Sequence, residues 1–331
     1  MEAFEIDLSP LKHMPLQKNR FHFSISPEGL PQEFAFDPFL FLQKKHLQTQ
    51  SEDELLFFQL LDQKTAEIVT HLPVFVNENG VACSPGKAPF GSIQFKDQLQ
   101  EEVLAEFLTQ TKRYLFEVKN CRIFKIKSYP FAYAPSESAV LTELLLKQEF
   151  KISHSEINHH IAVNAEAFEN NLHPSARRRL FKCLKNEFIF REERDEQLPE
   201  VWDFINFCRK ERKYEPPLPL QKLTELFQEF PAHFRTFTIR QAGKLAAATI
   251  AVQVNKQILY NFYPANPVSF NAFSPIVLLT QGLYQVCQKE EISLLDLGTS
   301  NLPEGPNFPL IAFKKHLGGK PSLKLSFEIK Q

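Results

Sequence analysis

The chain repeats one order of predicted secondary-structure elements, and this repeat constrains its fold more than any single motif does. In the first half, residues 57–76 predict a β-hairpin, and the Asn-Gly pair at Asn79 and Gly80 predicts a tight turn before a further strand. Residues 234–265 repeat the order strand, turn, longer strand, turn and strand. In both halves a helix, a strand, a second helix and a closing strand follow, judged by the apolar periodicity. The repeat predicts an α/β protein of two similar halves, each a mixed sheet with helices on its faces.

We place the boundary between the halves near Val163. Residues 1–163 are then the first domain, and residues 164–331 hold a connecting helix and the second domain. The connecting helix is expected within residues 167–187, and the adjacent prolines Pro216 and Pro217 are expected to end a later helix, because proline cannot continue one.

The composition narrows the class of protein. A net charge of −1 over 331 residues gives no global attraction to nucleic acids or anionic membranes, so such partners must be sought in local patches. The five cysteines form no C-x-x-C pair, which argues against a zinc site or a disulfide framework and favours a reducing compartment. No basic and apolar leader and no apolar run of about 20 residues is found. We therefore expect a cytoplasmic protein without membrane insertion.

Six short segments add to the repeat, and together they carry a resemblance to a known family. They are "APFGSI" (88–93), "SARRRLFKCLKNEF" (175–188), "LYNFYPA" (259–265), "SPIVLL" (274–279), "LLDLGTSN" (294–301) and "FKKHLGG" (313–319). With these segments the chain resembles the GNAT-type N-acyltransferases, and its duplication resembles the Fem-type aminoacyltransferases. The resemblance implies two tandem GNAT-like domains that move an acyl or aminoacyl group to the amine of a small molecule or peptide. The donor would be acyl-CoA or aminoacyl-tRNA, and no metal is expected.

One segment departs from the family pattern. GNAT enzymes that use acyl-CoA usually have a glycine-containing turn before the third helix, where free backbone N–H groups hold the pyrophosphate. The corresponding residues 266–275 contain no glycine. Two hypotheses therefore stay open: a transferase, for which aminoacyl-tRNA would be a donor that does not need this turn, and a non-catalytic ligand-binding protein on a transferase scaffold.

Three residues are candidates for the chemistry of transfer. Asp296 falls near the end of a predicted strand, where ligands of open α/β sheets tend to bind, and could act as a general base. Its alternative role is to bond the N–H groups of the following turn. Asn261 and Tyr263 are expected on one face of their strand and could donate hydrogen bonds to a carbonyl, whereas Tyr260 is expected to point away. Core packing explains either tyrosine equally well.

Six further residues are candidates for donor or substrate binding. They are Ser274, Thr299, Ser300, Asn301, Arg178 and Lys182. Ser274 is the expected N-cap of a helix, and Asp296 together with residues 299–301 is expected to form an exposed polar edge. The cations lie in the basic stretch 177–185, whose other interpretation is a solvated helix face. Gly318 and Gly319 are expected to cap a helix, and not to hold a phosphate.

Overall fold

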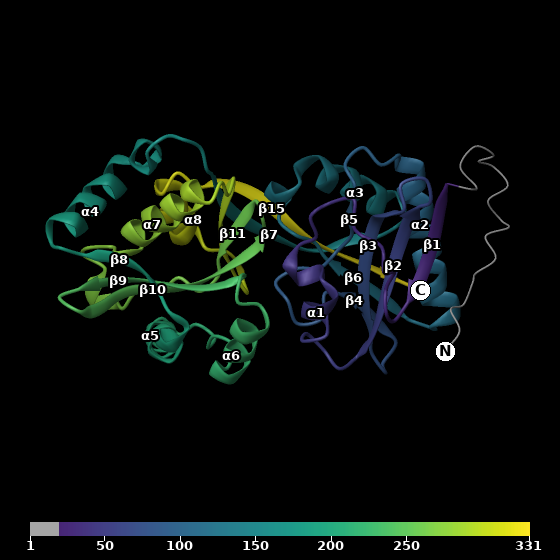
Figure 1. Ribbon diagram of the computed structural model, residues 1–331, viewed down its shortest axis with the longest axis horizontal. Helices are drawn as coiled ribbons and strands as arrows, with labels where there is room; N and C mark the ends of the chain where they lie inside the picture. Colours follow the sequence, from purple (N-terminus) through teal and green to yellow (C-terminus); the bar gives the residue numbers. More distant parts are fainter. Residues whose placement is uncertain (1–19) are drawn as a thin grey trace. The chain divides into compact units, whose positions relative to one another are not determined.

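The computed structural model describes residues 20–331, which divide into two compact units (Figure 1). Unit 1 contains the described residues up to Ser155 together with Leu323–Gln331, and unit 2 contains Glu156–Ser322. The N-terminal stretch that entered the expectation about a leader lies outside the described residues. Within the described part of the chain, no helix is long and apolar enough to cross a membrane.

The sheet of unit 1 is built from a long hairpin and the strands that flank it. Its order is β1 (Phe21–Ser26), β2 (Glu54–Asp62), β3 (Glu67–Val76), β4 (Val81–Ser84), β6 (Ile123–Lys127) and β15 (Lys320–Lys330), and the short β5 (Gln94–Phe95) pairs with β3. Strands β4 and β6 are parallel, and β15 lies antiparallel to β6, with Ser326 opposite Lys127. A segment more than 190 positions further along the chain than β6 thus completes this sheet.

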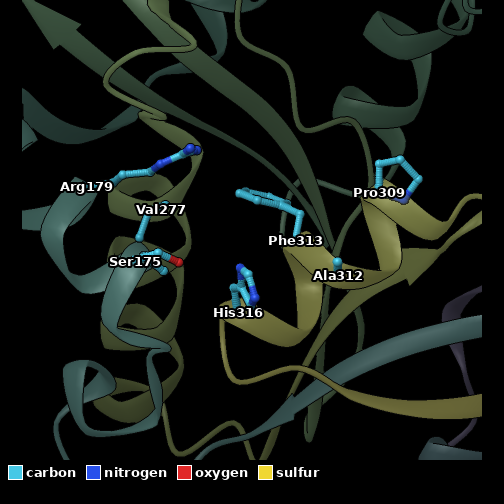
Figure 2. Close-up of a pocket in the computed structure, with 8 residues that line it drawn as sticks. Ser175, Arg179, Val277, Pro309, Ala312, Phe313 and His316 are labelled. Carbon is cyan, nitrogen blue, oxygen red and sulfur yellow. The ribbon is translucent and has the colours of Figure 1, made fainter.

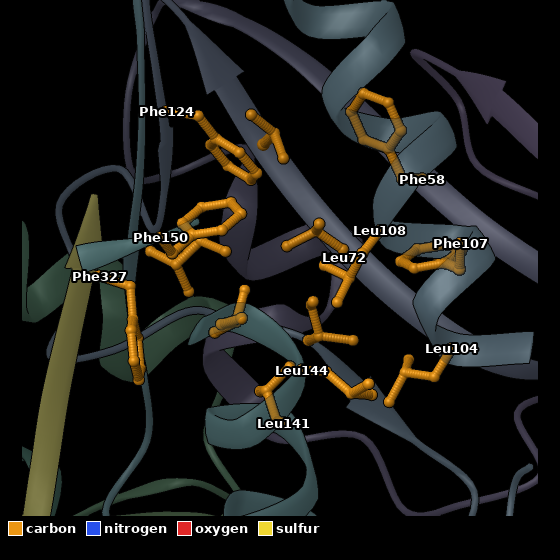
Figure 3. Packing of buried hydrophobic residues seen from close by; sticks show 14 of the residues in the cluster. Phe58, Leu72, Leu104, Phe107, Leu108, Phe124, Leu141, Leu144, Phe150 and Phe327 are labelled. Atoms are coloured by element: carbon orange, nitrogen blue, oxygen red, sulfur yellow. The ribbon is translucent and has the colours of Figure 1, made fainter. Parts of the chain in front are cut away.

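The core of unit 1 lies between this sheet and two helices, α2 (Glu101–Arg113) and α3 (Pro135–Lys147). Helix α2 buries Val103, Leu104, Phe107 and Leu108, the spacing that places side chains on one helical face. Figure 3 shows these helices contributing Leu104, Phe107, Leu108, Leu141 and Leu144 to a cluster with Phe58, Leu72, Phe124, Phe150 and Phe327 of the strands and loops. The remaining helical segments are short: η1 (Leu40–Leu42), α1 (Lys44–Leu47), η2 (Tyr114–Val118) and η3 (Phe131–Tyr133).

A buried polar network ties the segment between β1 and β2 to the sheet of unit 1. His71 on β3 has one ring nitrogen, Nε2, 2.9 Å from the carbonyl oxygen of Leu42. Because a carbonyl can only accept, Nε2 carries the proton, and Nδ1 accepts from the amide nitrogen of Gln59 at 3.1 Å. The amide oxygen of Gln59 in turn accepts from the N–H of Leu30. Burial lowers the pKa of His71 to about 4, so its imidazole is neutral near pH 7.

The sheet of unit 2 has the order β7 (Lys151–Ala162), β12 (Leu294–Thr299), β11 (Ile258–Asn261), β10 (Lys244–Asn255), β9 (Phe234–Gln241) and β8 (Ile189–Glu193). Strands β11 and β12 are parallel, and the other neighbouring pairs are antiparallel. Residues 158–162 of β7, expected in the first domain, pair with β12, whereas residues 326–330 of β15 pair with β6. Each closing strand therefore pairs in the other half from the one that the sequence division at Val163 implies. That this division separates two folding units stays a prediction.

Helices cover both faces of the sheet in unit 2 (Figure 1). Helices α4 (Pro174–Lys185) and α7 (Ile276–Lys289) share one apolar cluster with β9, β10 and β12, and α5 (Leu198–Glu211) and α6 (Leu220–Glu229) pack on β9 and β10 from the other side. Gly282 brings α7 so near to β8 that a Cβ there would lie 2.2 Å from the Phe190 ring. The remaining segments are η4 (Phe168–Asn171), η5 (Asp195–Gln197), η6 (Val268–Phe270), β13 (Asn301–Leu302), β14 (Gly305–Pro306) and α8 (Phe308–His316).

The glycine pair after α8 caps that helix, as the sequence predicted. Gly318 has a φ of +84°, and the N–H groups of Gly318 and Gly319 donate to the carbonyls of Lys315 and Lys314. These two bonds satisfy carbonyls that the last helical turn leaves without a partner.

Candidate functional site

A cavity of about 280 Å³ opens in unit 2 among α4, α7 and α8 (Figure 2). Its lining is Ser175, Ala176 and Arg179 of α4, Val277 of α7, and Pro309, Ala312, Phe313 and His316 of α8. Figure 2 shows Arg179 extending from α4 toward the side of the Phe313 ring, with His316 further along α8. The cavity therefore combines an apolar wall with a guanidinium, a hydroxyl and an imidazole.

The start of α4 is fixed to the end of α8 beside this cavity. The imidazole rings of His173 and His316 stack with their centroids 4.1 Å apart, and the N–H of His173 donates to the carbonyl of His316. His173 also caps α4, because its Nδ1 accepts from the N–H of Ser175. Two walls of the cavity are thus joined by a stacked pair and a backbone hydrogen bond.

Asp296 holds a bulge in β12. Its side chain is 1% exposed, so its expected place on an exposed edge is wrong. Oδ1 accepts from Asn158 Nδ2 and from the N–H of Gly298, both at 2.8 Å. The pairing with β7 shifts register between Asp296 and Gly298, where Gly298 has a φ of +75°. The bond to Gly298 is the turn-holding role that the sequence left open for Asp296. Asp296 does not line the cavity, and its part in catalysis stays a prediction.

Two side chains outside the candidate set of the sequence analysis lie around this bulge: Lys314, and Tyr260, which was set aside there. Lys314, 7% exposed, donates to the carbonyls of Gly298 and Thr299 at 2.8 and 2.7 Å. Burial lowers the pKa of Lys314 to about 8, although the nearby Asp296 acts in the opposite direction. Tyr260 pairs with Asp296 across the parallel strands, and a Cβ on Gly298 would lie 3.3 Å from its ring. Paired residues of neighbouring strands share a face, so the pairing of β11 with β12, which the sequence did not predict, brings Tyr260 beside Asp296.

The expected common face of Asn261 and Tyr263 is wrong. The N–H groups of Phe262 and Tyr263 both donate to the carbonyl of Ile250, so the alternation of β11 is broken after Asn261. Asn261 Oδ1 accepts from Thr249 Oγ1 at 2.6 Å. The phenol oxygen of Tyr263 accepts instead from the N–H of Leu218, near α6. The bulge therefore separates the two candidates.

The polar residues expected at an exposed edge are largely enclosed. Ser300 is 0% exposed and bonds Nδ1 of His159 at 3.1 Å, so its expected exposure is wrong. Asn301 Oδ1 accepts from the N–H of Ile157 on β7, and Thr299 uses its carbonyl for Lys314. Through these hydrogen bonds the three residues connect the end of β12 to β7 and to α8.

Ser274 does not cap α7. The helix begins at Ile276 with Pro275 as N-cap, and no side chain bonds its first N–H groups. Ser274 has a φ of +56° and is 7% exposed. Ser274 therefore belongs to the tight turn that leads into α7, and its predicted role as the N-cap is wrong.

The basic stretch on α4 contributes a different cation than expected. Arg178 is exposed and does not line the cavity, and Lys182 donates to the carbonyl of Ala272 and lies 4.4 Å from the centroid of the Phe273 ring. Arg179, the next residue after Arg178, is the cation of this stretch that lines the cavity. Among residues 20–331, no group of three His, Cys, Asp or Glu side chains could hold a metal ion.

Comparison with known proteins shows which proteins share this arrangement. Residues 174–308 match the family model described as "Acetyltransferase (GNAT) domain". The chain has a GNAT-like fold. The matched segment begins at the first residue of α4 and so includes the cavity-lining residues of α4 and α7. No curated protein matches the sequence.

Solved structures extend this likeness over the whole GNAT-like chain. The structure titled "Crystal structure of FemX" is similar with a TM-score of 0.68 and 11% identity, and the match covers 100% of this chain and 98% of that one. The C-terminal domain of a putative lysylphosphatidylglycerol synthetase from Agrobacterium fabrum matches with a TM-score of 0.53 and 11% identity, over 82% of this chain and 84% of that one. "L-PGS from Bacillus licheniformis" matches with a TM-score of 0.52 and 11% identity, over 90% and 93% of the two chains. At these identities the likeness concerns the fold, and the expected α/β fold class, a GNAT-like fold similar to that of Fem-type proteins, is confirmed.

Proposed function

We propose that unit 2 transfers an acyl or aminoacyl group from an activated donor to the amine of a small molecule or peptide. The observation that carries this proposal is the cavity itself, because its walls on α4 and α7 lie within the segment that matches the acetyltransferase family, and its remaining wall, on α8, follows directly after that segment. Fold alone does not fix chemistry, so the proposal rests on what the cavity offers to a donor.

The cavity suits a phosphate next to an apolar group. A guanidinium such as that of Arg179 binds phosphate oxygens through paired N–H groups, and Ala312 and Phe313 provide an apolar wall. A volume of about 280 Å³ lies just below the usual range for ligand pockets, roughly 300 to 1,000 Å³. The cavity would therefore hold part of a larger donor. Acyl-CoA and aminoacyl-tRNA both carry phosphates, and they remain the two donors to be compared.

Transfer also needs a proton acceptor for the amine and a donor for the oxyanion. Asp296 remains our candidate acceptor, although its Oδ1 is occupied by Asn158 and Gly298. Asn261 and Tyr263 remain candidate donors, and each has a hydrogen-bond partner in the structure described here. Because the bulge separates these two, at most one of them would face a given carbonyl.

The experiment offers the full chain two donors in parallel, labelled acetyl-CoA and a mixture of charged tRNAs, each with a panel of amines and short peptides. Product is detected by mass spectrometry as an acyl or aminoacyl group on the amine. Ala312→Trp fills the cavity and is expected to abolish transfer, and Arg179→Ala is expected to raise KM for the donor about tenfold or more, as the loss of a charge-assisted hydrogen bond predicts. Arg191→Ala on β8 removes an exposed arginine that does not line the cavity and serves as the matched control.

A non-catalytic binding protein is the second candidate. The absence of glycine in residues 266–275 and the engagement of Asp296 in holding the bulge both favour it. Calorimetry separates the two functions: saturable binding of a donor, weakened by Ala312→Trp, with no product on any amine supports this second candidate. Absence of both binding and product contradicts both.

A further inference from the structure

The outward side of α4 exposes large apolar side chains next to cations. Phe181 is 55% exposed and Leu184 is 46% exposed, whereas Ala176, Leu180 and Cys183 face the core of unit 2. Residues three and four positions apart are neighbours on a helix, so Phe181 is flanked by Arg177, Arg178, Leu184 and Lys185. We call these five outward residues, 177, 178, 181, 184 and 185, the α4 surface. Figure 1 shows α4 on the outer side of α7, with no further element of unit 2 over it.

The cations of the α4 surface form no ion pairs with the residues that the structure describes. Helix α4 carries five cationic residues and no Asp or Glu. Arg177 donates to the backbone carbonyl of Glu169 and forms no ion pair with a described residue. Arg178 and Lys185 form no ion pair with any residue in the described part of the chain. Since the whole protein has a net charge of −1, this is a local positive field.

We propose that the α4 surface docks the protein onto an anionic phospholipid bilayer. Cations on a helix attract the negative headgroups, and a phenylalanine and a leucine between them lose contact with water at the level of the headgroups. The docking is peripheral, because no described helix is long and apolar enough to span a bilayer. It concerns where the protein works and is independent of the proposed transfer chemistry.

Single-stranded RNA is the competing partner for such a surface, since phosphates would meet the cations and a base could stack on Phe181. Leu184 favours the bilayer, because an aliphatic side chain adds apolar area but no ring on which a second base could stack. The test therefore offers both partners.

The test is cosedimentation of the full chain with phosphatidylcholine vesicles, with or without a third of phosphatidylglycerol, at 0.1 M salt. We expect binding to the anionic vesicles, weaker binding to the neutral ones, and loss of binding as salt is raised. Arg178→Gln with Lys185→Gln is expected to weaken binding about 25-fold, at about fivefold for each cation. Phe181→Ser with Leu184→Ser is expected to weaken it on the order of tenfold, from the apolar area that returns to water.

Phe207→Ser is the matched control. Phe207 on α5 is 54% exposed, nearly the same as Phe181 at 55%. Its helical neighbours, however, are the acidic Asp203 and Glu211 as well as the basic Lys210. This variant is expected to bind vesicles within twofold of the unchanged protein, and circular dichroism establishes that all variants are folded.

Three results would overturn the proposal. The first is equal binding to neutral and anionic vesicles. The second is that Phe207→Ser weakens binding as much as the double variant Phe181→Ser with Leu184→Ser. The third is tight binding of a labelled RNA that the α4 variants lose, without any binding to vesicles. Anionic-vesicle binding that only the α4 variants lose supports it.

Discussion

Acid is expected to destabilise unit 1 through His71. In the unfolded chain a histidine takes up a proton as the pH falls through 6.5, whereas folded His71 resists protonation until about pH 4. Between these values the unfolded state binds more protons, so the free energy of unfolding falls as the pH falls. A pKa of about 4 in place of 6.5 corresponds to a loss of about 3 kcal/mol, complete near pH 4.

The hydrogen-bond network supplies the physical reason. A proton on Nδ1 of His71 would face the amide nitrogen of Gln59, which is itself a donor, and the Gln59 oxygen is held by the N–H of Leu30. His71 is 1% exposed, so water cannot solvate the new charge. The charged imidazole has neither an acceptor nor solvent within this network.

The variant His71→Gln isolates this effect. Its amide nitrogen can still donate to the carbonyl of Leu42, but it cannot take up a proton. The variant is expected to be less stable than the unchanged protein at pH 7, and this difference should shrink by about 3 kcal/mol at pH 4. Urea unfolding from pH 7.5 to 4 measures both proteins, and the low pKa of His159 affects them equally. If the two proteins lose stability in parallel, or if His71 titrates near pH 6.5 by nuclear magnetic resonance, the reasoning is wrong.

Three further substitutions test the bulge and the close packing of unit 2. Asp296→Asn keeps an oxygen for Asn158 and Gly298, so the melting temperature should change by only a few degrees while turnover falls at least tenfold. Intact turnover with a large loss of melting temperature would reject the catalytic role of Asp296. Gly282→Ala forces its Cβ against the Phe190 ring and should cost about 1–3 kcal/mol in a thermal melt, whereas a neutral result would refute the close approach of α7 to β8. Gly318→Ala places a side chain at a φ of +84° and should cost about 1–2 kcal/mol by the same assay.

The sequence predicted the order of elements because that order rests on local signals. Hairpin turns, helical periodicity and the glycines at the end of α8 each act over a few residues, and the structure has the corresponding elements in each place. The closing strands β7 and β15 were also predicted as strands, over residues 151–163 and 322–330. Their partners were not predicted, because pairing depends on contacts between distant parts of the chain.

The candidate site was less predictable, and bulges are the main reason. Strict alternation fails after Asn261 and again at Gly298, so side chains beyond these points face differently from the two-residue pattern. The cavity could not be predicted at all, because it needs α4, α7 and α8 to meet and the first of these ends 123 positions before the last begins. Arg179 and His316 line the same cavity only because these three helices pack together.

The pairing of β15 with β6 has a consequence for how the protein forms. A ribosome releases β1 to β6 early, but residues 326–330, which complete that sheet, are made only after all of unit 2. Until then β6 presents an open edge of N–H and C=O groups from Ile123 to Lys127, the kind of edge that pairs with other chains. Nascent unit 1 therefore has to be shielded, or kept dilute, for as long as unit 2 takes to be synthesised.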